Sequence, residues 1–341
     1  MEKVILFFII MMLFCSCGDS FLNDDYSGGD WFYLENKDAI MPVWVKGNLQ
    51  SETFIIFLHG GPGGSAMFDT IFDAYRELEK DYAFVWWDQR GSGLSQGNAT
   101  PDSYTIDQFV EDLEKLVALV QHKYNNPTLF LMGHSWGGAL GTAFLINPRN
   151  QTHISGWIPI GSAHNWRGSD LLSIEWVVEK ATEQIDLGKN VDYWEKEINW
   201  YNKNPKLTNS NNLSRHGNNI GKLNGDYYNP LNVPYYSPTI VFNTPYNFSF
   251  LLNNPYMLSN NKLDFENLNL VPEINKITIP SLILWGKHDG IVPVALAFET
   301  YDNIGSYDKH IYIFENSAHN PPFEEPELFV ERVREFIGKY K

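Results

Sequence analysis

The chain has 341 residues, of which 43% are hydrophobic and 19% are charged. This length allows one large domain or two smaller ones, and the composition excludes a disordered chain and a multi-span membrane protein. Its 25 Lys and Arg residues stand against 41 Asp and Glu residues, so the formal net charge is −16. The composition therefore predicts a soluble globular body. Because a phosphate backbone repels this excess of negative charge, we expect no nucleic acid among its partners.

The first residues have the pattern of a targeting segment. An apolar run from Val4 to Phe14 follows a lysine, and it is too short for a spanning helix, which needs about 20 residues. The small Ser16 before Cys17 resembles the processing site of bacterial lipoproteins. We therefore expect a signal peptide over 1–17, lipidation at Cys17, and a membrane-anchored lipoprotein of a bacterial cell envelope. The alternative is simple secretion, with the protein free outside the cell or in the periplasm.

The cysteines of the chain are Cys15 and Cys17, so both lie in that segment. The remaining body has no thiol, which excludes a cysteine nucleophile, a thiolate metal site and a disulfide. Residues 18–30 are polar and contain glycines, and we expect a flexible tether there. We expect neither a metal nor an organic cofactor. We expect the protein to contact a membrane only through the lipid anchor.

Apolar runs of strand length alternate with helical patterns from residue 31 onward. The clearest helix is expected over 106–124, where apolar residues repeat at steps of three and four, and a closing helix is expected over 326–340. Strands alternating with helices predict an α/β fold with a mostly parallel central sheet flanked by helices. The expected strands are Trp31–Leu34, Val43–Val45, Phe54–Leu58, Tyr82–Trp87, Leu129–Met132, Ile154–Ile160, Ser281–Trp285 and His310–Phe314.

This alternation is interrupted over 162–276, so we expect a core in two parts, 31–161 and 277–341. Between Asn199 and Asn261 there are 17 asparagines in 63 residues, a composition that suits no buried sheet. A disordered insert is one possibility. Aromatic anchors favour instead a helical and loop-rich cap inserted after the sixth strand, and these anchors include Trp176, Trp194 and Trp200.

A first chemical motif is Gly133-His134-Ser135-Trp136-Gly137, between an apolar strand and a helix-like run over 139–146. This is the G-x-S-x-G pattern in the strand-turn-helix context of a nucleophile elbow. The glycines permit a tight turn that exposes the serine hydroxyl, and the helix N-terminus favours developing negative charge. Ser135 is therefore the candidate nucleophile. The simpler alternative is a chance glycine-rich turn.

A second glycine-rich stretch, His59-Gly60-Gly61-Pro62-Gly63, follows an expected strand. A loop with so little side-chain bulk brings backbone N–H groups close to a reacting carbonyl, as an oxyanion hole requires. We assign the oxyanion donors to the amides of Gly61 and Trp136, with a simple strand-ending turn as the alternative. We expect His59 to be a structural hydrogen-bonding residue and not a base.

Two further candidates follow the last expected strands, Asp289 after 281–285 and His319 after 310–314. A serine hydroxyl is a weak nucleophile at neutral pH, so it needs an imidazole to take its proton and a carboxylate to orient that imidazole. Either residue alone would more often be a turn or surface residue. Together with Ser135 they follow the chain order of the α/β-hydrolase triad, which favours a Ser-His-Asp triad here.

Three motifs together resemble the proline iminopeptidase group of α/β-hydrolases: His59–Gly63, Asp88–Ser95 and Gly133–Gly138. The resemblance covers about residues 31–160 and 277–341. It implies an α/β-hydrolase fold and a serine peptidase, a prolyl aminopeptidase that removes an N-terminal residue, often proline, from short peptides.

The same resemblance implies that Ser135, Asp289 and His319 form the triad and that the two amides named above form the oxyanion hole. We expect the stretch 88–95 to be structural, with Arg90 holding neighbouring backbone.

The residues that bind the substrate are not identified by the sequence. Cap carboxylates bind the free amino terminus in the family that the chain resembles. The candidates in this cap are more simply interpreted as solvated helix-face charges, and they are Glu175, Glu179, Glu195 and Glu197. The sequence thus predicts an acyl-enzyme hydrolase of short peptides. A hydrolase of carboxylic esters or lactones is the alternative on the same scaffold, and a non-catalytic binding lipoprotein is a third interpretation.

Overall fold

The computed structural model describes residues 29–207, 210–229, 257 and 263–341. The predicted signal peptide, Cys17 and all but the end of the tether lie outside these residues. Within the described part, nine strands form a single sheet. They are β1 Asp30–Asn36, β2 Ala39–Gly47, β3 Thr53–Leu58, β4 Ala83–Trp87, β5 Gln96–Gly97, β6 Thr128–His134, β7 Gly156–Ile160, β8 Ser281–Gly286 and β9 Lys309–Phe314.

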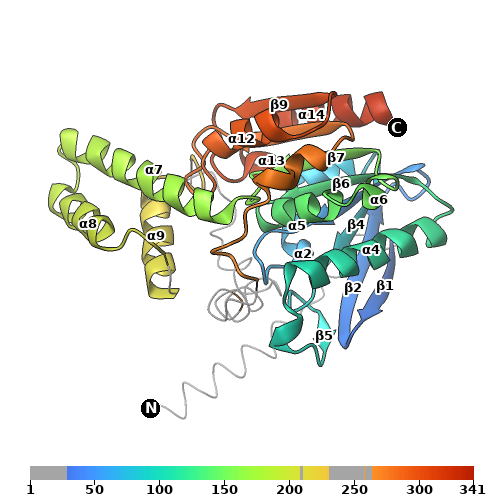
Figure 1. The fold of residues 1–341 in the computed structure, drawn as a ribbon. Coiled ribbons are helices and arrows are strands. Elements are labelled where there is room, and N and C mark those ends of the chain that lie inside the picture. Colours follow the sequence, from blue (N-terminus) through green and yellow to red (C-terminus); the bar gives the residue numbers. More distant parts are fainter. Residues whose placement is uncertain (1–28, 208–209, 230–256, 258–262) are drawn as a thin grey trace, which may run out of the picture.

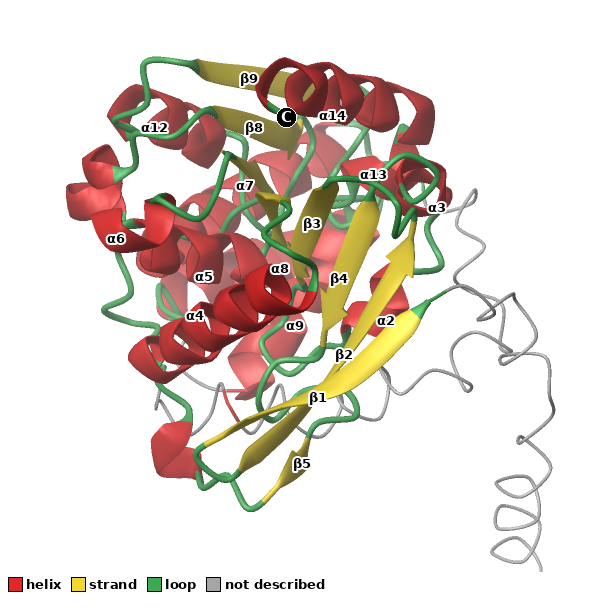
Figure 2. Ribbon diagram, turned by 90° about the vertical axis from the view of Figure 1, so that its right-hand side faces the viewer, coloured by secondary structure: helices red, strands yellow, loops and turns green. Residues whose placement is uncertain are grey.

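The strand order is β1-β2-β4-β3-β6-β7-β8-β9, with β5 paired to β2. Every neighbouring pair from β4 to β9 is parallel, whereas β2 runs antiparallel to β1, β4 and β5. The α/β fold with a mostly parallel sheet is therefore confirmed, and Figure 2 shows the twisted sheet between two layers of helices. In such a sheet the carboxyl ends of the parallel strands meet at one edge.

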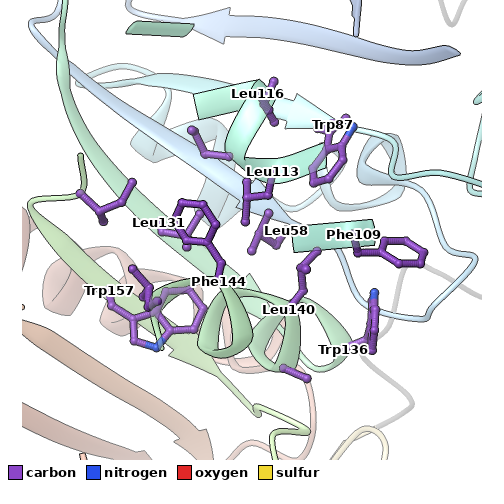
Figure 3. Packing of buried hydrophobic residues seen from close by; sticks show 14 of the residues in the cluster. Leu58, Trp87, Phe109, Leu113, Leu116, Leu131, Trp136, Leu140, Phe144 and Trp157 are labelled. Carbon is purple, nitrogen blue, oxygen red and sulfur yellow. The ribbon is translucent and has the colours of Figure 1, made fainter. Parts of the chain in front are cut away.

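Both faces of the sheet are covered because its central strands are apolar on both sides. In β3, Phe54, Ile56 and Leu58 pack on one face, while Ile55 and Phe57 pack on the other. Figure 3 shows the first of these two cores, where side chains of α4 and α5 meet those of the strands. The helices on this face are α4 Ile106–Lys123, α5 Trp136–Leu145 and α12 Ala295–Asn303, and those on the other face are α3 Asp73–Leu78 and α14 Pro326–Tyr340.

Helix α4 shows why the local sequence forms the expected element. Thr105 caps its N-terminus by accepting a hydrogen bond from the backbone N–H of Gln108 at 3.3 Å, and Asp107 lies in the first turn. The apolar stripe is buried against the sheet: Phe109, Leu113, Leu116, Val117 and Val120. The helix predicted over 106–124 is thus confirmed to within one residue.

Between β7 and β8 the described residues contain three longer helices, α7 Trp166–Asp186, α8 Val191–Lys203 and α9 Ser210–Lys222, which we call the insertion helices. They lie to one side of the sheet (Figure 1). They follow the sixth strand that the sequence predicted, but β7 is the seventh in the structure. The extra strand, β5, has only two exposed residues and so carries no apolar signal.

The remaining helical segments are short: α2 Ala66–Asp69, α6 Pro148–Gln151, α13 Pro321–Glu324, and the 3-10 helices Pro101–Ser103 and Val271–Lys276. None of the helices in the described ranges combines the length and apolar character needed to cross a membrane.

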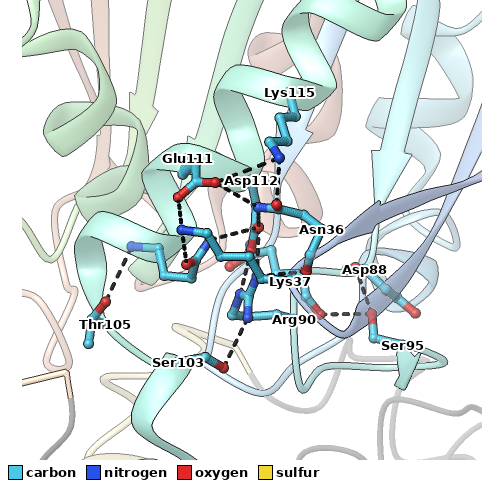
Figure 4. Close-up of polar contacts among 12 residues, drawn as sticks. Asn36, Lys37, Asp88, Arg90, Ser95, Ser103, Thr105, Glu111, Asp112 and Lys115 are labelled. Carbon is cyan, nitrogen blue, oxygen red and sulfur yellow. Dashed lines mark hydrogen bonds and ion pairs between the residues drawn. The ribbon is translucent and has the colours of Figure 1, made fainter. Parts of the chain in front are cut away.

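The loop after β4 is structural, as predicted, but Arg90 acts mainly on a side chain. Its guanidinium donates to both carboxylate oxygens of Asp112 in α4, at 2.6 and 2.7 Å, and both side chains are fully buried (Figure 4). A longer bond of 3.4 Å reaches the carbonyl of Asn36. Asp112 could not be identified as the partner from the sequence, because it lies 22 residues away on another element.

Candidate active site

Ser135 is the single residue between the end of β6 and the start of α5. Its backbone angles are φ 54° and ψ −116°, a conformation that is strained for a residue with a side chain. Its N–H donates to the carbonyl of Ile160 at 2.9 Å, and its carbonyl accepts from Gly138 and Ala163 at 2.9 and 3.1 Å. Strand β7 and helix α5 therefore hold the strained residue in place.

The flanking glycines are required by close backbone approach. A Cβ atom at Gly137 would lie 1.9 Å from the carbonyl oxygen of Leu58, and one at Gly133 would lie 2.4 Å from the carbonyl oxygen of Gly137. Any side chain at these positions would separate α5 from β3 or break the turn. This is the physical reason for the G-x-S-x-G pattern in this chain.

The glycine-rich loop that contains Gly61 passes next to Ser135, and Trp136 follows Ser135 directly in the chain. A Cβ atom at Gly60 would be 3.5 Å from the Cβ of Ser135, so the glycine-rich loop passes directly against the serine. Gly61 has φ 131°, which favours glycine. Trp136 is the first residue of α5, where backbone N–H groups have no partner within the helix. Its buried indole donates to Gln89 at 2.8 Å and fixes the helix start.

Asp289 and His319 form a buried pair beyond the ends of β8 and β9. The distance between His319 Nδ1 and Asp289 Oδ2 is 2.7 Å. The other oxygen, Oδ1, accepts hydrogen bonds from the amides of Ile291 and Val292 at 2.9 and 2.8 Å. The carboxylate is thus held on both oxygens, with one of them directed at the imidazole.

The pKa of His319 is raised above the ordinary histidine value. Burial alone would lower it, but the adjacent Asp289 carboxylate outweighs burial, and the charges of Asp226 and Glu324 act in the same direction. An imidazole with a raised pKa is a stronger base for a serine hydroxyl.

Residues adjacent to Ser135 and to its backbone partner lie against His319. The ring of His134, next to Ser135, lies 4.8 Å from the ring of His319 and its Nε2 is 2.9 Å from the carbonyl oxygen of His319. A Cβ atom at Gly161, next to the Ile160 that binds Ser135, would lie 3.2 Å from the His319 ring. Burial, with a smaller effect of His319, lowers the pKa of His134 to about 3, so His134 is neutral and donates to that carbonyl.

His59 has the structural role expected of it. Its Nδ1 lies 2.7 Å from the carbonyl of Gly60, while its Nε2 accepts from the amide of Gln89 at 3.2 Å. Complete burial lowers its pKa to about 4, so the ring is neutral with its proton on Nδ1. His59 therefore ties the glycine-rich loop to the loop after β4.

The four glutamates suggested by the sequence do not gather at this site. Glu175, Glu179 and Glu195 are exposed, as solvated charges would be. Glu197 differs from the expectation, because it is 4% exposed and accepts from the Nε and Nη2 of Arg215, each at 2.7 Å. The two residues of this ion pair are 18 positions apart on separate helices, so the sequence contains no local pattern that predicts the pair.

Two acidic residues that the sequence analysis did not single out lie beside His319. The carbonyl of Asp226 accepts from the backbone N–H of His319 at 3.1 Å, and Asn320 Nδ2 contacts the Asp226 carboxylate at 3.3 Å. Glu324 Oε2 accepts from the amide of Ala318 at 2.7 Å. Burial raises the pKa of both acids, that of Glu324 to about 7.

The only signal for Glu324 in the sequence is its position five residues after His319, and nothing near Asp226 in the sequence points to that residue. As to metals, the described residues contain no group of three His, Asp or Glu side chains placed to hold an ion.

Comparison with known proteins gives similar relatives over most of the chain. A probable aminopeptidase, YbaC of Bacillus subtilis (strain 168), is 27% identical over 314 residues, covering 85% of this chain and 91% of the relative. A proline iminopeptidase of Saccharolobus solfataricus is 28% identical over 309 residues, covering 86% of this chain and 87% of the relative.

The fold is shared with solved structures at lower identity. The esterase EaEST from Exiguobacterium antarcticum superposes with a TM-score of 0.60 at 19% identity, covering 88% of this chain and 96% of the esterase. Residues 53–326 match the family described as alpha/beta hydrolase fold. With the elbow, the sheet order and this match over most of its length, the chain belongs to the alpha/beta hydrolase fold family.

Proposed function

We propose that the protein is a serine hydrolase with Ser135 as nucleophile, His319 as general base and acid, and Asp289 as the group that orients the imidazole. The observation that carries this proposal is the buried 2.7 Å contact between His319 Nδ1 and Asp289, next to a serine held in a strained elbow. Strain of this kind is retained where the surrounding structure imposes it for function.

In the proposed reaction, Ser135 Oγ attacks the substrate carbonyl carbon while His319 Nε2 takes the hydroxyl proton. The electron pair of the carbonyl moves to its oxygen, and the amides of Gly61 and Trp136 stabilise that oxyanion. When the tetrahedral intermediate collapses, His319 gives the proton to the leaving group and an acyl-enzyme remains. Water then attacks the acyl group with His319 again as base, releasing the acid and restoring Ser135.

For the substrate we propose a short peptide with a free amino terminus, cleaved in the manner of a proline iminopeptidase. Two observations support this choice. The aminopeptidase and proline iminopeptidase relatives align over 85% and 86% of the chain. The acids Asp226 and Glu324 lie close enough to His319 to act on its pKa. Burial raises the pKa of both acids, and when they are ionised their negative charge would attract an ammonium group.

An ester or lactone hydrolase is the second candidate. It is favoured by the cap glutamates, since three are exposed to solvent, Glu197 is paired with Arg215, and none of the four is among the groups that act on His319. The same triad and oxyanion donors would serve an ester carbonyl without change.

The experiment that separates the two candidates measures hydrolysis by the purified full-length protein. Its substrates are proline coumarin amide, the same amide with an acetylated nitrogen, and short nitrophenyl esters, each with the Ser135→Ala variant as control. We expect turnover of the free amine amide and loss of turnover on acetylation. Ester turnover with both amides inert would retain the triad and replace the peptidase proposal with the esterase one.

We also propose that the protein is exported and that a lipid on Cys17 holds it at a membrane of a bacterial cell envelope. This rests on the short apolar run before Ser16-Cys17. The body would then work in water beside that membrane, where small peptides or esters reach it by diffusion.

A further inference from the structure

The loop that follows Asp289 is held by two serines of the insertion helix α7. Ser173 Oγ donates to the carbonyl of Gly290, and Ser169 Oγ donates to the carbonyl of Ile291 at 3.1 Å. The two serines are four residues apart, so they lie on the same face of the helix. They are 2% and 6% exposed, which shields both bonds from water.

These are the same two peptide groups that hold the Asp289 carboxylate. The peptide joining Gly290 and Ile291 accepts from Ser173 at its carbonyl and donates to Asp289 Oδ1 at its N–H. The next peptide accepts from Ser169 and donates, through the Val292 N–H, to the same oxygen. Because a trans peptide is planar with N–H and C=O pointing in opposite directions, a bond at the carbonyl sets the direction of the N–H. It also polarises the group and strengthens the bond that the N–H makes.

Ser173 is in turn oriented by a buried chain of side chains. Its single hydroxyl proton is used on Gly290, so Nε2 of His216, 2.8 Å from Ser173 Oγ, must donate to that oxygen. His216 Nδ1 must then accept from the hydroxyl of Tyr201, also at 2.8 Å. Asn219 Nδ2 donates to the Tyr201 oxygen at 3.2 Å, which leaves the Tyr201 proton for His216.

This chain of donors crosses all three insertion helices. His216 and Asn219 come from α9, Tyr201 comes from α8, and all three are at most 5% exposed. Asn219 also donates to Glu197 at 2.9 Å, so the chain begins at the ion pair of Glu197 with Arg215. It requires a neutral imidazole, and burial lowers the pKa of His216 to about 4.

We propose that Ser169 and Ser173 are positioning residues for the Asp289 carboxylate, and that His216 acts through Ser173 to couple the orientation of this carboxylate to the packing of the insertion helices. The inference rests on the proposed triad, since it assigns a role only through Asp289. It adds that the insertion helices contribute to the chemical step.

The test uses full-length protein and a fluorophosphonate, which labels an activated serine whatever the natural substrate is. We expect Ser173→Ala to lower the labelling rate constant about tenfold, because a displaced carboxylate orients the base less well. Ser173→Thr, which keeps the hydroxyl, should recover most of that loss. Thr182→Ala is the matched control, since it removes one hydroxyl from the exposed part of the same helix.

A pH profile of labelling separates positioning from a structural effect. The charged and titratable groups that act on His319 are Asp289, Asp226 and Glu324, with the ring of His134 packed against it. A carboxylate that is no longer fixed raises the His319 pKa less, so the acidic limb of the Ser173→Ala profile should move to lower pH. The double variant Ser173→Ala with Tyr201→Phe should be labelled no more slowly than Ser173→Ala alone, because Tyr201 acts on Asp289 only through Ser173.

Labelling of Ser173→Ala at the wild-type rate with an unmoved limb would overturn the inference. Equal losses in Ser173→Ala and Thr182→Ala, with both limbs unmoved, would also overturn it and leave a purely structural role. Failure of the wild-type protein to react would instead refute the proposed triad, so the two failures are distinguishable.

Discussion

The two carboxylate oxygens of Asp289 have different partners. One oxygen faces His319 at 2.7 Å and the other is fixed by two amides. Asp289→Asn keeps the shape but presents an N–H or a weaker acceptor to the imidazole, so the wrong His319 tautomer is favoured. We expect kcat for the best substrate of the panel to fall by about 10³–10⁴-fold with KM changed little. Steady-state kinetics check this, and wild-type kcat in the variant would exclude Asp289 from the triad.

The raised pKa of His319 predicts where activity is lost in acid. The imidazole works as a base only when neutral, so kcat/KM should fall as the pH drops through the pKa of His319, which is raised above the ordinary histidine value. The pKa of Glu324 is itself raised to about 7 by burial, so Glu324 raises the pKa of His319 only in its ionised form. Glu324→Gln removes that charge and should move the limb to lower pH. Glu331→Gln, an exposed acid on α14, is the control and should leave the limb in place. A limb unmoved by Glu324→Gln would refute the effect of Glu324 on the base.

At this scale, site residues could be predicted from the sequence where their order and spacing in the chain are characteristic. Ser135 has flanking glycines, and Asp289 and His319 follow strand ends, so parallel topology alone predicts that the three lie near one edge. Asp226 and Glu324 carry no such pattern. Their place beside His319 results from the loop after α9 and the end of α13 meeting there, which a single sequence does not reveal.

At the scale of elements, the close packing of α5 against β3 after the β6–α5 turn requires glycine at position 137. Gly137→Ala places a Cβ atom 1.9 Å from the backbone oxygen of Leu58, and backbone of the central strand cannot move aside. We expect the variant to lose activity and to unfold at a lower denaturant concentration. Gly217→Ala in α9, where nothing lies within 4 Å, should instead raise the free energy of unfolding by about 0.5–1 kcal/mol. Chemical denaturation compares them, and equal effects would contradict this packing.

The ion pair of Arg90 and Asp112 joins the loop after β4 to α4 without solvent. Arg90→Ala leaves the Asp112 charge buried and unpaired, and should cost about 3–5 kcal/mol of unfolding free energy. The double variant Arg90→Met with Asp112→Leu should be less destabilised, because no isolated charge remains. Lys276→Ala, which breaks an exposed pair with Glu273, is the control and should have little effect in the same denaturation experiment. A double variant as unstable as Arg90→Ala would contradict the account.

Elements were predictable where apolar periodicity was strong. All eight expected strands are present, and α14 matches its expected limits. Their apolar side chains repeat with the period of the element that buries them, on one face or on both faces. The exposed β5 and the buried pairing of Glu197 were missed for the opposite reason. Neither depends on local periodicity, and both arise only when distant elements meet.

At the scale of the whole molecule, the proposed lipid on Cys17 makes a prediction about location. Intact protein expressed in a bacterial host should sediment with membranes, and Cys17→Ala should move it to the soluble fraction, because the charged body has little affinity of its own for lipid. Cell fractionation followed by immunoblotting checks this. The same distribution for both proteins would remove the anchor from the account.

The central claim for the whole molecule is that Ser135 is the nucleophile of a serine hydrolase. The most direct measurement is to label the full-length protein with a fluorophosphonate and map the adduct by mass spectrometry of its peptides. We predict a single adduct on the peptide containing Ser135, formed in parallel with loss of turnover and absent from Ser135→Ala. No adduct, or an adduct on another serine with turnover lost at the same rate, would contradict the claim.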